Sequence, residues 1–220
     1  MAGGSDGRAA GAGAAGAGAA GAAGGGDLDD LVDPTGAQRP TAVQRVTLPR
    51  LTGAQVALVP VSLGLARAVV AGEDPTPFLT PLLAGRGWPH ADTVDALRPL
   101  AEHGEEGDDG GWLVVRDGEV VGDCGWRGGP DAEGSVVIGY GLAAPARRQG
   151  LGTEAVALLC AWAEQQPGVQ RIVADVHLDN EASRRMLRRL GFVERPDDPP
   201  WVRCVRDPDA APRIRGRHVC

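Results

Sequence analysis

The sequence predicts an α/β fold in which a central mixed antiparallel/parallel sheet is flanked by helices. Two observations predict this class. First, three short apolar segments between residues 112 and 142 are separated by Asp-Gly and Gly-Gly-Pro-Asp turns, a pattern typical of an antiparallel meander. Second, two predicted helices at 150–166 and 180–190 enclose a β-branched strand at 171–176. The resulting order, β-β-β-α-β-α-β-β, indicates a mixed sheet with helices packed on it.

The composition limits the classes of function. A formal net charge of -7 argues against a general nucleic-acid binder and is compatible with a cationic or amine-bearing substrate. The four cysteines lie far apart without a C-x-x-C pair, so the spacing of a zinc site is missing and we expect buried or terminal thiols. We see neither a membrane-spanning segment nor the features of a secretory signal, which predicts a cytoplasmic protein.

Both ends of the chain are expected to lie outside the folded domain. Residues 1–40 are mostly Gly and Ala, followed by acids and prolines, and such a segment has no large apolar side chains to offset the entropy of ordering. We therefore predict a disordered tail over 1–40, one domain over 41–206 and a C-terminal tail over 207–220.

The first half of the domain predicts strands at 43–48 and 54–61. Ser62 can cap a following helix over Leu63–Ala71. The segment 74–90 is rich in Pro and Gly, which forbids long regular elements. Asp92 can then cap a helix over Thr93–His103.

In the second half, strands at 112–116 and 120–126 flank Asp117-Gly118, the strongest short-range hairpin signal, and a third strand covers 136–142. Beyond the first predicted helix and the strand at 171–176, Asn180 opens the second helix and Gly191 ends it as its C′ residue. A last hairpin is predicted to join 192–193 to 201–205.

A basic, glycine-containing turn opens the helix that follows the meander. It reads Arg147-Arg148-Gln149-Gly150-Leu151-Gly152-Thr153. Such a turn leaves backbone N–H groups free at a helix N-terminus, where the helix dipole favours negative charge, and its glycines let the backbone approach a ligand closely. The two arginines can add charge-assisted bonds to a diphosphate. The glycines match neither the Walker cradle nor the full dinucleotide fingerprint, so by itself the turn could also be an ordinary connection.

Two blocks together resemble the GCN5-related N-acetyltransferases (GNAT). The first, Arg147-x-x-Gly150-x-Gly152 between a strand and a helix, is similar to the family's motif A, which holds the pyrophosphate of acetyl-coenzyme A. The second runs from Asn180-Glu181-Ala182-Ser183 to Leu190-Gly191-Phe192 and is similar to the family's N-x-x-S/A…L-G-F segment, closest to the RimJ/RimL-like branch. The resemblance covers about 42–205, most strongly 112–192, and it implies the GNAT acyl-CoA N-acyltransferase fold.

The resemblance also implies acetyl-CoA as acetyl donor, with no metal. By position, the splayed backbone of 139–143 would pair with the pantetheine amides, the turn 149–154 would hold the pyrophosphate, and Asn180 would contact the pantetheine arm. The predicted cofactor-binding residues are Tyr140, Gly141, Leu142, Ala143, Arg147, Arg148, Gln149, Gly150, Leu151, Gly152, Thr153, Asn180 and Ser183.

Ser183 is the candidate acid that protonates the departing thiolate, with a plain first-turn helix role as the alternative. Many relatives place a tyrosine acid one helical turn further on, and Leu187 stands at that position here. Tyr140, the single tyrosine of the chain, is expected to pack beside the cleft rather than to catalyse.

The base is less sharply indicated. Relatives often carry a glutamate in the strand at the position that Val137 occupies here. Glu133 is the candidate base, and the local alternatives are Asp123, Asp175 and His177. A base acting through water would also suffice, because an α-amine with a pKa near 8 loses its proton readily.

Trp88, His90 and Trp126 are the candidate substrate contacts, with core packing as the alternative, since the first two lie where this family builds its variable acceptor site. Four arginines at 184, 185, 188 and 189 form a basic stripe whose default interpretation is a solvated face, with contact to a nucleotide 3′-phosphate as the alternative.

The sequence therefore predicts an N-acetyltransferase that transfers an acetyl group from acetyl-CoA to a primary amine, either a protein N-terminus or a small molecule, by direct attack. The alternatives are a non-catalytic CoA-binding regulatory module and an aminoglycoside-type antibiotic acetyltransferase. The predicted partners are acetyl-CoA and the amine acceptor, without nucleic acid or membrane, and association as a homodimer is left open.

Overall fold

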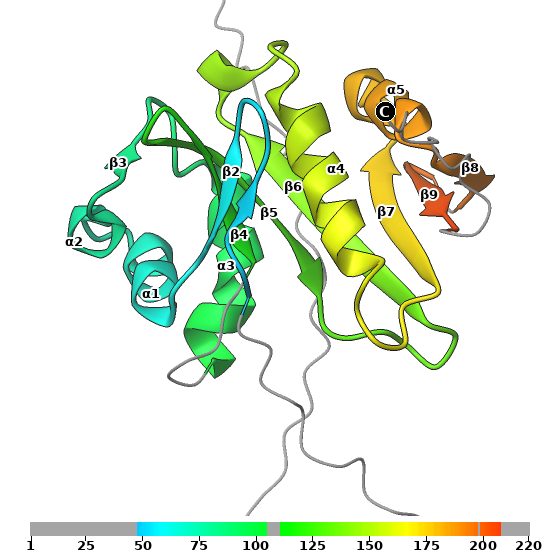
Figure 1. Ribbon diagram of the computed structural model, residues 1–220, viewed down its shortest axis with the longest axis horizontal. Coiled ribbons are helices and arrows are strands. Elements are labelled where there is room, and N and C mark those ends of the chain that lie inside the picture. The colour runs from blue at the N-terminus through cyan, green and yellow to red at the C-terminus, as the bar shows by residue number, and fades with distance from the viewer. Residues whose placement is uncertain (1–47, 105–110, 198, 208–220) are drawn as a thin grey trace, which may run out of the picture. The chain divides into compact units, whose positions relative to one another are not determined.

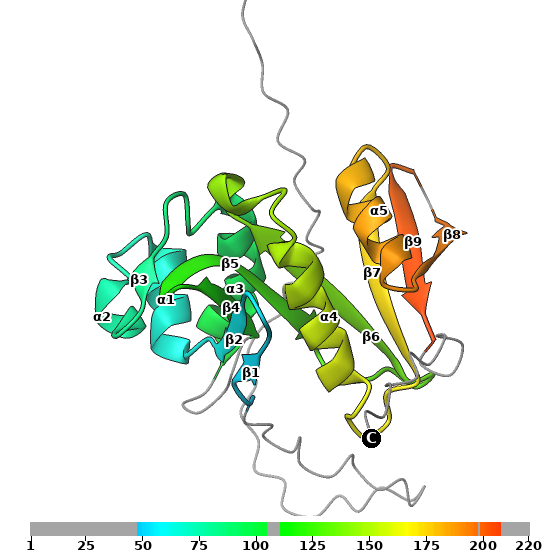
Figure 2. The same ribbon diagram turned by 45° about the horizontal axis from the view of Figure 1, so that its top comes forward.

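A computed structural model describes residues 48–104, 111–197 and 199–207, in which one mixed sheet carries helices on both faces (Figures 1 and 2). The predicted tails and the predicted strand at 43–48 fall almost wholly outside these ranges. The first elements are β1 (Leu51–Thr52), β2 (Ala57–Pro60), α1 (Leu63–Ala71), α2 (Thr76–Leu79), β3 (Leu83–Ala84) and α3 (Ala91–His103). They are followed by β4 (Trp112–Arg116), β5 (Glu119–Arg127), β6 (Ser135–Leu142), η1 (Ala144–Ala146), α4 (Leu151–Ala163), β7 (Arg171–His177), α5 (Glu181–Arg189), β8 (Val193–Pro196) and β9 (Trp201–Arg206).

The strand order is β1-β2-β4-β5-β6-β7-β9-β8, and β3 pairs with the start of β5. Among the strands of the described ranges only two pairs are parallel, β6 with β7 and the short β3 with β5, so the predicted mixed antiparallel/parallel sheet is confirmed. The predicted meander is formed by β4, β5 and β6.

Local sequence signals account for several element ends. The β4–β5 hairpin turns through Asp117 and Gly118, whose φ angles of 50° and 82° are both left-handed, as a type I′ turn requires. The Ser62 hydroxyl accepts a hydrogen bond from the Leu65 N–H at 3.3 Å, which confirms the predicted cap of α1. At the end of α5, Gly191 takes the left-handed φ of 86° predicted for the C′ residue.

The predicted cap of α3 is wrong. The helix begins at Ala91, two residues earlier than expected, and its N-cap is His90, whose Nδ1 accepts from the Thr93 N–H at 3.2 Å. Asp92 lies inside the first turn instead, where the helix dipole still favours its charge. The His90 imidazole thus takes the capping role that was expected of the Asp92 carboxylate.

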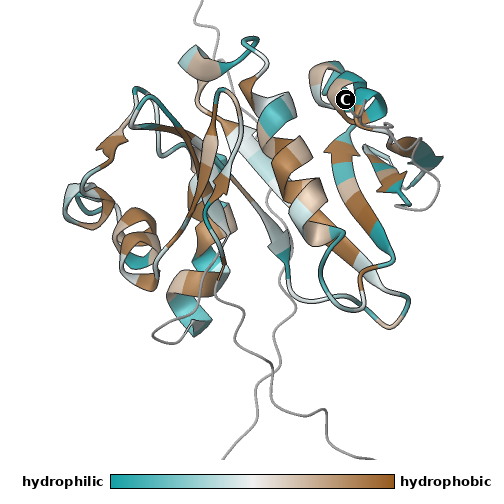
Figure 3. Cartoon of the chain, in the orientation of Figure 1, coloured by the Kyte–Doolittle hydropathy of each residue, from teal (hydrophilic) through white to brown (hydrophobic). Residues whose placement is uncertain are grey.

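Two apolar cores lie on the two faces of the sheet. The larger one, under α4, includes Trp112, Ile138, Leu159 and Ile172, all almost completely buried, and Figure 3 shows apolar residues along most of α4 and β7. The smaller one lies under α1 and α3 and contains Leu65, Trp88, Leu97 and Leu113. The three described cysteines, Cys124, Cys160 and Cys204, are buried and free, as predicted for them. No helix in the described ranges has the length and apolar character needed to cross a membrane.

Candidate functional site

The centre of the site is a gap between two neighbouring strands. β6 and β7 are paired only from Ser135 to Val137 and from Arg171 to Val173, although both strands continue well beyond these residues. Figures 1 and 2 show the strands diverging toward the ends of α4 and α5 where these helices begin. A parallel pair thus opens into a wedge, with backbone groups of β6 along one side.

The hydrogen-bond pattern of β6 shows which of its groups face the gap. The Ala143 N–H donates to the Val121 carbonyl of β5 at 2.9 Å. In an antiparallel pair the bonded positions alternate, so the N–H groups of Leu142 and Tyr140 point away from β5 and into the gap. These groups can bind the amides of an extended ligand lying between the strands.

The glycine turn closes the wide end of the gap. Arg148 and Gly150 have left-handed φ angles of 62° and 85°, and α4 begins at Leu151 with no side chain capping its N-terminus. The N–H groups of the first turn of α4 are therefore open to an external acceptor, in the arrangement that binds phosphate. This geometry fits the diphosphate that the turn was predicted to hold.

Arg147, Arg148 and Gln149 of the turn are all exposed, and two of these side chains shape the turn through hydrogen bonds. The Arg147 Nε donates to the Leu142 carbonyl at 2.8 Å, and the Gln149 Nε2 donates to the Pro145 carbonyl at 2.9 Å. Arg147 therefore fastens the turn to the end of β6, and Gln149 fastens it to η1. Arg148 is exposed and lies beside the open N-terminus of α4, where a guanidinium can reach a bound anion.

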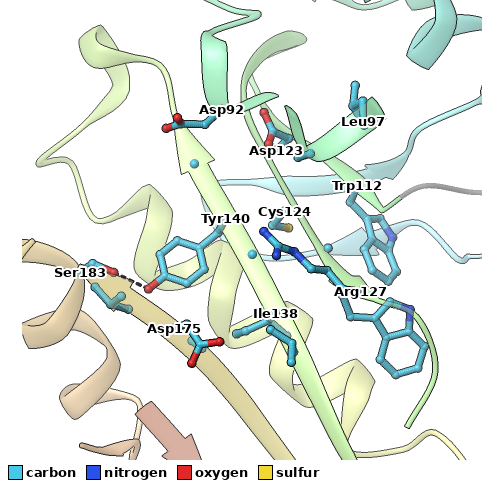
Figure 4. A pocket seen from close by; sticks show the side chains of 18 of the residues that line it. Asp92, Leu97, Trp112, Asp123, Cys124, Arg127, Ile138, Tyr140, Asp175 and Ser183 are labelled. Atoms are coloured by element: carbon cyan, nitrogen blue, oxygen red, sulfur yellow. Dashed lines mark hydrogen bonds between the residues drawn. The ribbon is translucent and has the colours of Figure 1, made fainter. Parts of the chain in front are cut away.

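A pair of hydroxyls lies across the gap from this turn. Asn180 caps α5 through its Oδ1, which accepts from the Ser183 N–H at 3.2 Å, and the Ser183 Oγ is 2.5 Å from the Tyr140 Oη (Figure 4). Burial raises the pKa of Tyr140 to about 12, so the phenol stays protonated near neutral pH. Leu187, one turn further along α5, is fully buried and offers no polar group.

A cleft of about 430 Å³ lies on the sheet face that α3 borders and reaches Tyr140 and Ser183 through the gap. A shift of the β4–β5 register skips Val121, after which the β5 residues Cys124 and Trp126 pack toward α4. The alternate residues of β5 and their partners on β6 therefore face the cleft. They include three glycines, Gly125, Gly139 and Gly141, which we call the glycine floor.

Asp123 is the buried carboxylate of this cleft. The Thr93 hydroxyl donates to its Oδ2, and the His90 Nε2 lies 3.9 Å from the same oxygen. Burial raises the pKa of Asp123, while the Thr93 bond, the His90 ring and the Trp88 indole act to lower that pKa and Asp92 acts to raise it. The indole is close enough for that effect, yet neither its N–H nor the His90 Nε2 makes a hydrogen bond of normal geometry among the described residues.

The structure separates the predicted substrate contacts. Trp126 lines the cleft while packing edge-on against Trp162, with ring centroids 4.7 Å apart. Trp88 is only 5% exposed and belongs to the smaller core. His90 covers Gly141, since a Cβ built there would lie 2.8 Å from its Cε1. Neither Trp88 nor His90 is among the residues that line the cleft.

The four candidate bases are also separated. Glu133 lies in the turn before β6, exposed and outside the residues that line the cleft, and its N–H donates to Asp131. Asp123, Asp175 and His177 line the cleft. Of these, Asp175 accepts from the Arg203 Nε at 2.9 Å, whereas Asp123 has no arginine partner among the described residues.

The basic stripe of α5 is engaged in ion pairs. The Arg184 Nη2 lies 2.8 Å from Glu194 of β8, and the Arg188 Nη2 lies 2.7 Å from Glu181. Hydrogen bonding to Arg184 lowers the pKa of Glu194. The Arg184–Glu194 pair fastens the helix to the β8–β9 hairpin, whereas the Arg188–Glu181 pair lies within α5. Both pairs fit the default interpretation of a solvated face.

Two functional features were missed by sequence reasoning. The Tyr140–Ser183 contact joins residues 43 positions apart, and no local spacing could reveal it. Arg127, which lines the cleft at the end of β5, was not singled out from the sequence. Asp123 did carry a readable signal, because a single carboxylate inside an apolar strand is unusual unless it has a partner or a role.

Comparisons with known proteins agree with this geometry. The model of the acetyltransferase (GNAT) domain family matches residues 57–193. An uncharacterised N-acetyltransferase, YjdG, of Bacillus subtilis strain 168 is 35% identical over 113 residues, which are 48% of this chain and 67% of that protein. The solved structure of RimL, a ribosomal L7/L12 α-N-protein acetyltransferase in complex with coenzyme A, has a TM-score of 0.52 at 17% identity over 74% of this chain and 100% of that one. A probable acetyltransferase gives a TM-score of 0.50 at 16% identity over 73% and 97% of the two chains. At these identities the two structures show the fold alone.

Proposed function

The chain belongs to the GNAT family of acetyltransferases, and on that premise we propose that it transfers the acetyl group of acetyl-CoA to a primary amine by direct attack. One observation carries the proposal: the divergence of β6 from β7 sets an open strand edge between the N-terminus of α4 and the Tyr140–Ser183 pair. A phosphate site, an amide-binding edge and a proton donor then lie in sequence along one gap.

The residues of the gap fit the donor in each of its parts. The first turn of α4 and Arg148 would hold the pyrophosphate, and the inward N–H groups of β6 would pair with the pantetheine amides. Gly152 faces the same gap, because a Cβ built there would lie 3.4 Å from Leu142 and 3.8 Å from Met186. The thioester supplies an acetyl group already activated for attack by an amine.

The Leu142 N–H is suited to polarise the thioester carbonyl, since it points into the gap and is held in a strand before the reaction begins. The backbone carbonyl of Leu142 accepts a hydrogen bond from the Arg147 Nε at 2.8 Å, which keeps this part of the strand in place. A donor that needs no reorganisation stabilises the negative charge that develops on the carbonyl oxygen.

Ser183 would protonate the departing sulfur. The partly buried Tyr140 phenol stays protonated and would donate to the Ser183 Oγ in the reacting state, which leaves the proton of the serine free to turn toward the sulfur. As the C–N bond forms and the C–S bond breaks, this proton moves to the thiolate. Tyr140 thus orients the acid, a role beyond the packing predicted for it.

The test is thiol release by the full chain with acetyl-CoA and a panel of primary amines: peptides with free N-termini, amino acids, polyamines and aminoglycosides. We expect release that depends on both acetyl-CoA and amine. Acetyl-CoA binding measured by calorimetry, without thiol release for any amine, would overturn the transfer reaction and identify a binding module instead.

A further inference from the structure

The glycine floor lies between two opposite charges on one face of β5. Asp123 and Arg127 stand four residues apart on that strand, opposite Gly141 and Val137 of β6, and Gly125 opposite Gly139 lies between them. Four residues of strand separate the two Cα atoms by about 13 Å. The cleft therefore has a carboxylate at one end and a guanidinium at the other.

The floor between the charges is bare. Nothing lies within 4 Å of a Cβ built on Gly139, so the space above the middle of the floor is open. Asp123 and Arg127 are thus charged groups at the ends of a shallow channel. A small extended molecule can lie along this channel, with its two ends at two opposite charges.

The Asp123 end of the channel is the reacting end. Asp123 lies opposite Gly141, the neighbour of Leu142, whose N–H points into the gap where the thioester carbonyl is proposed to bind. An ammonium group at this carboxylate is therefore one strand away from the thioester. The hydroxyl of Thr93 holds the carboxylate in this orientation.

The Arg127 end is suited to an anion. Among the described residues none forms an ion pair or hydrogen bond with this guanidinium, and its cross-strand neighbour Val137 is apolar. Figure 4 shows the side chain directed into the cleft, toward Tyr140. A guanidinium offers its planar fork of donors to a carboxylate. Because a guanidinium is only weakly hydrated, its transfer from water to such a contact costs little free energy.

The other charged groups of the cleft do not disturb this arrangement of a negative end at Asp123 and a positive end at Arg127. Asp175 is held by Arg203 at 2.9 Å, and the His177 Nδ1 accepts from the Asp179 N–H at 3.2 Å. Asp92 lies in the first turn of α3, on the wall beside Asp123, where it adds to the negative potential of the same end. The polarity of the channel is therefore maintained by its surroundings.

We propose that the acceptor is a short amine that also carries a carboxylate, such as an amino acid or a dipeptide with a free C-terminus. Its ammonium binds at Asp123 and its carboxylate at Arg127. This inference rests on the proposed acetyl transfer and narrows its acceptor to small bipolar molecules, because a protein N-terminus carries a carboxylate this close to its α-amine only where its first residues are acidic.

Asp123 is then also the base of the reaction. It takes one proton from the ammonium, and the neutral nitrogen attacks the thioester carbon while the C–S bond breaks. The nitrogen loses a second proton as the amide forms, which balances the proton that the sulfur receives through Ser183. The proton on Asp123 returns to solvent, so the net products are the amide, the thiol and one proton.

Dipeptides with a free or an amidated C-terminus test the carboxylate, because their α-amines are chemically alike. With the wild-type chain and acetyl-CoA, we expect kcat/KM to be about 10- to 100-fold higher for the free acids, the worth of one charge-assisted hydrogen-bonded contact. Arg127→Gln should lower kcat/KM for the free acids to the level of the amides and so remove this preference. Arg127→Lys should retain part of the preference, since it keeps the charge but loses the fork.

Arg98→Gln is the matched control, because Arg98 is an exposed arginine of α3 outside the cleft lining. It should keep the full preference. Equal turnover of acids and amides by the wild type, or a preference that survives Arg127→Gln, would overturn the inference while leaving the acetyl transfer intact. No release with any amine would overturn the proposed function itself, so the two failures are distinguishable.

Asp123→Asn tests the other end of the channel. It should lower kcat for acids and amides alike and weaken the rise of activity with pH, because the amide side chain cannot accept the proton. Thermal unfolding of this variant shows whether it is folded. A folded Asp123→Asn chain with wild-type kcat and pH profile would overturn the role of Asp123.

Discussion

The Tyr140–Ser183 contact makes a prediction that a double-mutant cycle can test. Ser183→Ala removes the proposed acid and should lower kcat by about 10²-fold or more, the usual range for a positioned proton donor. Tyr140→Phe leaves the serine in place but removes the 2.5 Å bond that orients it. A net hydrogen bond is worth about 0.5–1.5 kcal/mol, so kcat should fall roughly 2- to 12-fold.

The two effects should not add. In the Ser183→Ala background the oriented hydroxyl is already absent, so Tyr140→Phe should have little further effect on kcat. Thiol release at saturating acetyl-CoA and amine measures kcat for the four chains. The phenol has a pKa of about 12, so its removal should leave the pH profile between pH 6 and 9 unchanged. Equal fold losses from Tyr140→Phe in both backgrounds would refute the orienting role.

Three further predictions concern the backbone and the buried carboxylate. Gly152→Glu should abolish acetyl-CoA binding in calorimetry and Gly152→Ala should retain it, because a Cβ there meets its first neighbour at 3.4 Å; unchanged affinity in Gly152→Glu would place the donor elsewhere. Burial raises the pKa of Asp123, so the stability that this side chain contributes is present at low pH and is lost as the pH rises through the folded-state pKa. The Tm of Asp123→Asn minus that of the wild type should therefore be larger at pH 8 than at pH 4. An equal Tm difference at both pH values would contradict the raised pKa. Gly141→Ala should destabilise the chain by about 1–3 kcal/mol in chemical denaturation, because its Cβ would lie 2.8 Å from the His90 ring, whereas Gly139→Ala has open space and should not; a similar loss in both would argue against this packing.

Most of the fold could be predicted because its signals are local. The Asp117-Gly118 turn, the Ser62 cap and the glycine that ends α5 each specify a backbone conformation within a few residues. The N-cap of α3 was misassigned because two nearby polar residues, His90 and Asp92, could both reach the open N–H groups. Which of them does so depends on the position of the preceding chain, which sequence spacing does not determine.

The site divides in the same way. The glycine turn and the α5 cap were predictable, because each is a short motif whose residues are contiguous. The cleft was not, because its shape depends on which β5 residues face α3. The register shift that skips Val121 settles this by turning Asp123 toward the cleft. Sequence alone gave Asp123 as one of several bases, and its burial beside Thr93 distinguishes it from Glu133.

Because successive side chains of a strand point to opposite faces of the sheet, proton donation and amine binding are proposed on opposite faces of β6. Tyr140 packs toward the α4 side of the sheet and meets Ser183 there, whereas Gly139 and Gly141, its neighbours on β6, face the cleft on the α3 side. Proton donation to the sulfur and capture of the amine therefore occur on opposite sides of one strand and meet at its open edge. Because a slip of one residue would exchange the two sets, the β5–β6 register is itself a requirement of the site. Pairing Gly125 with Gly139 leaves the middle of that register free of side chains, which lets an acceptor approach the edge from the cleft.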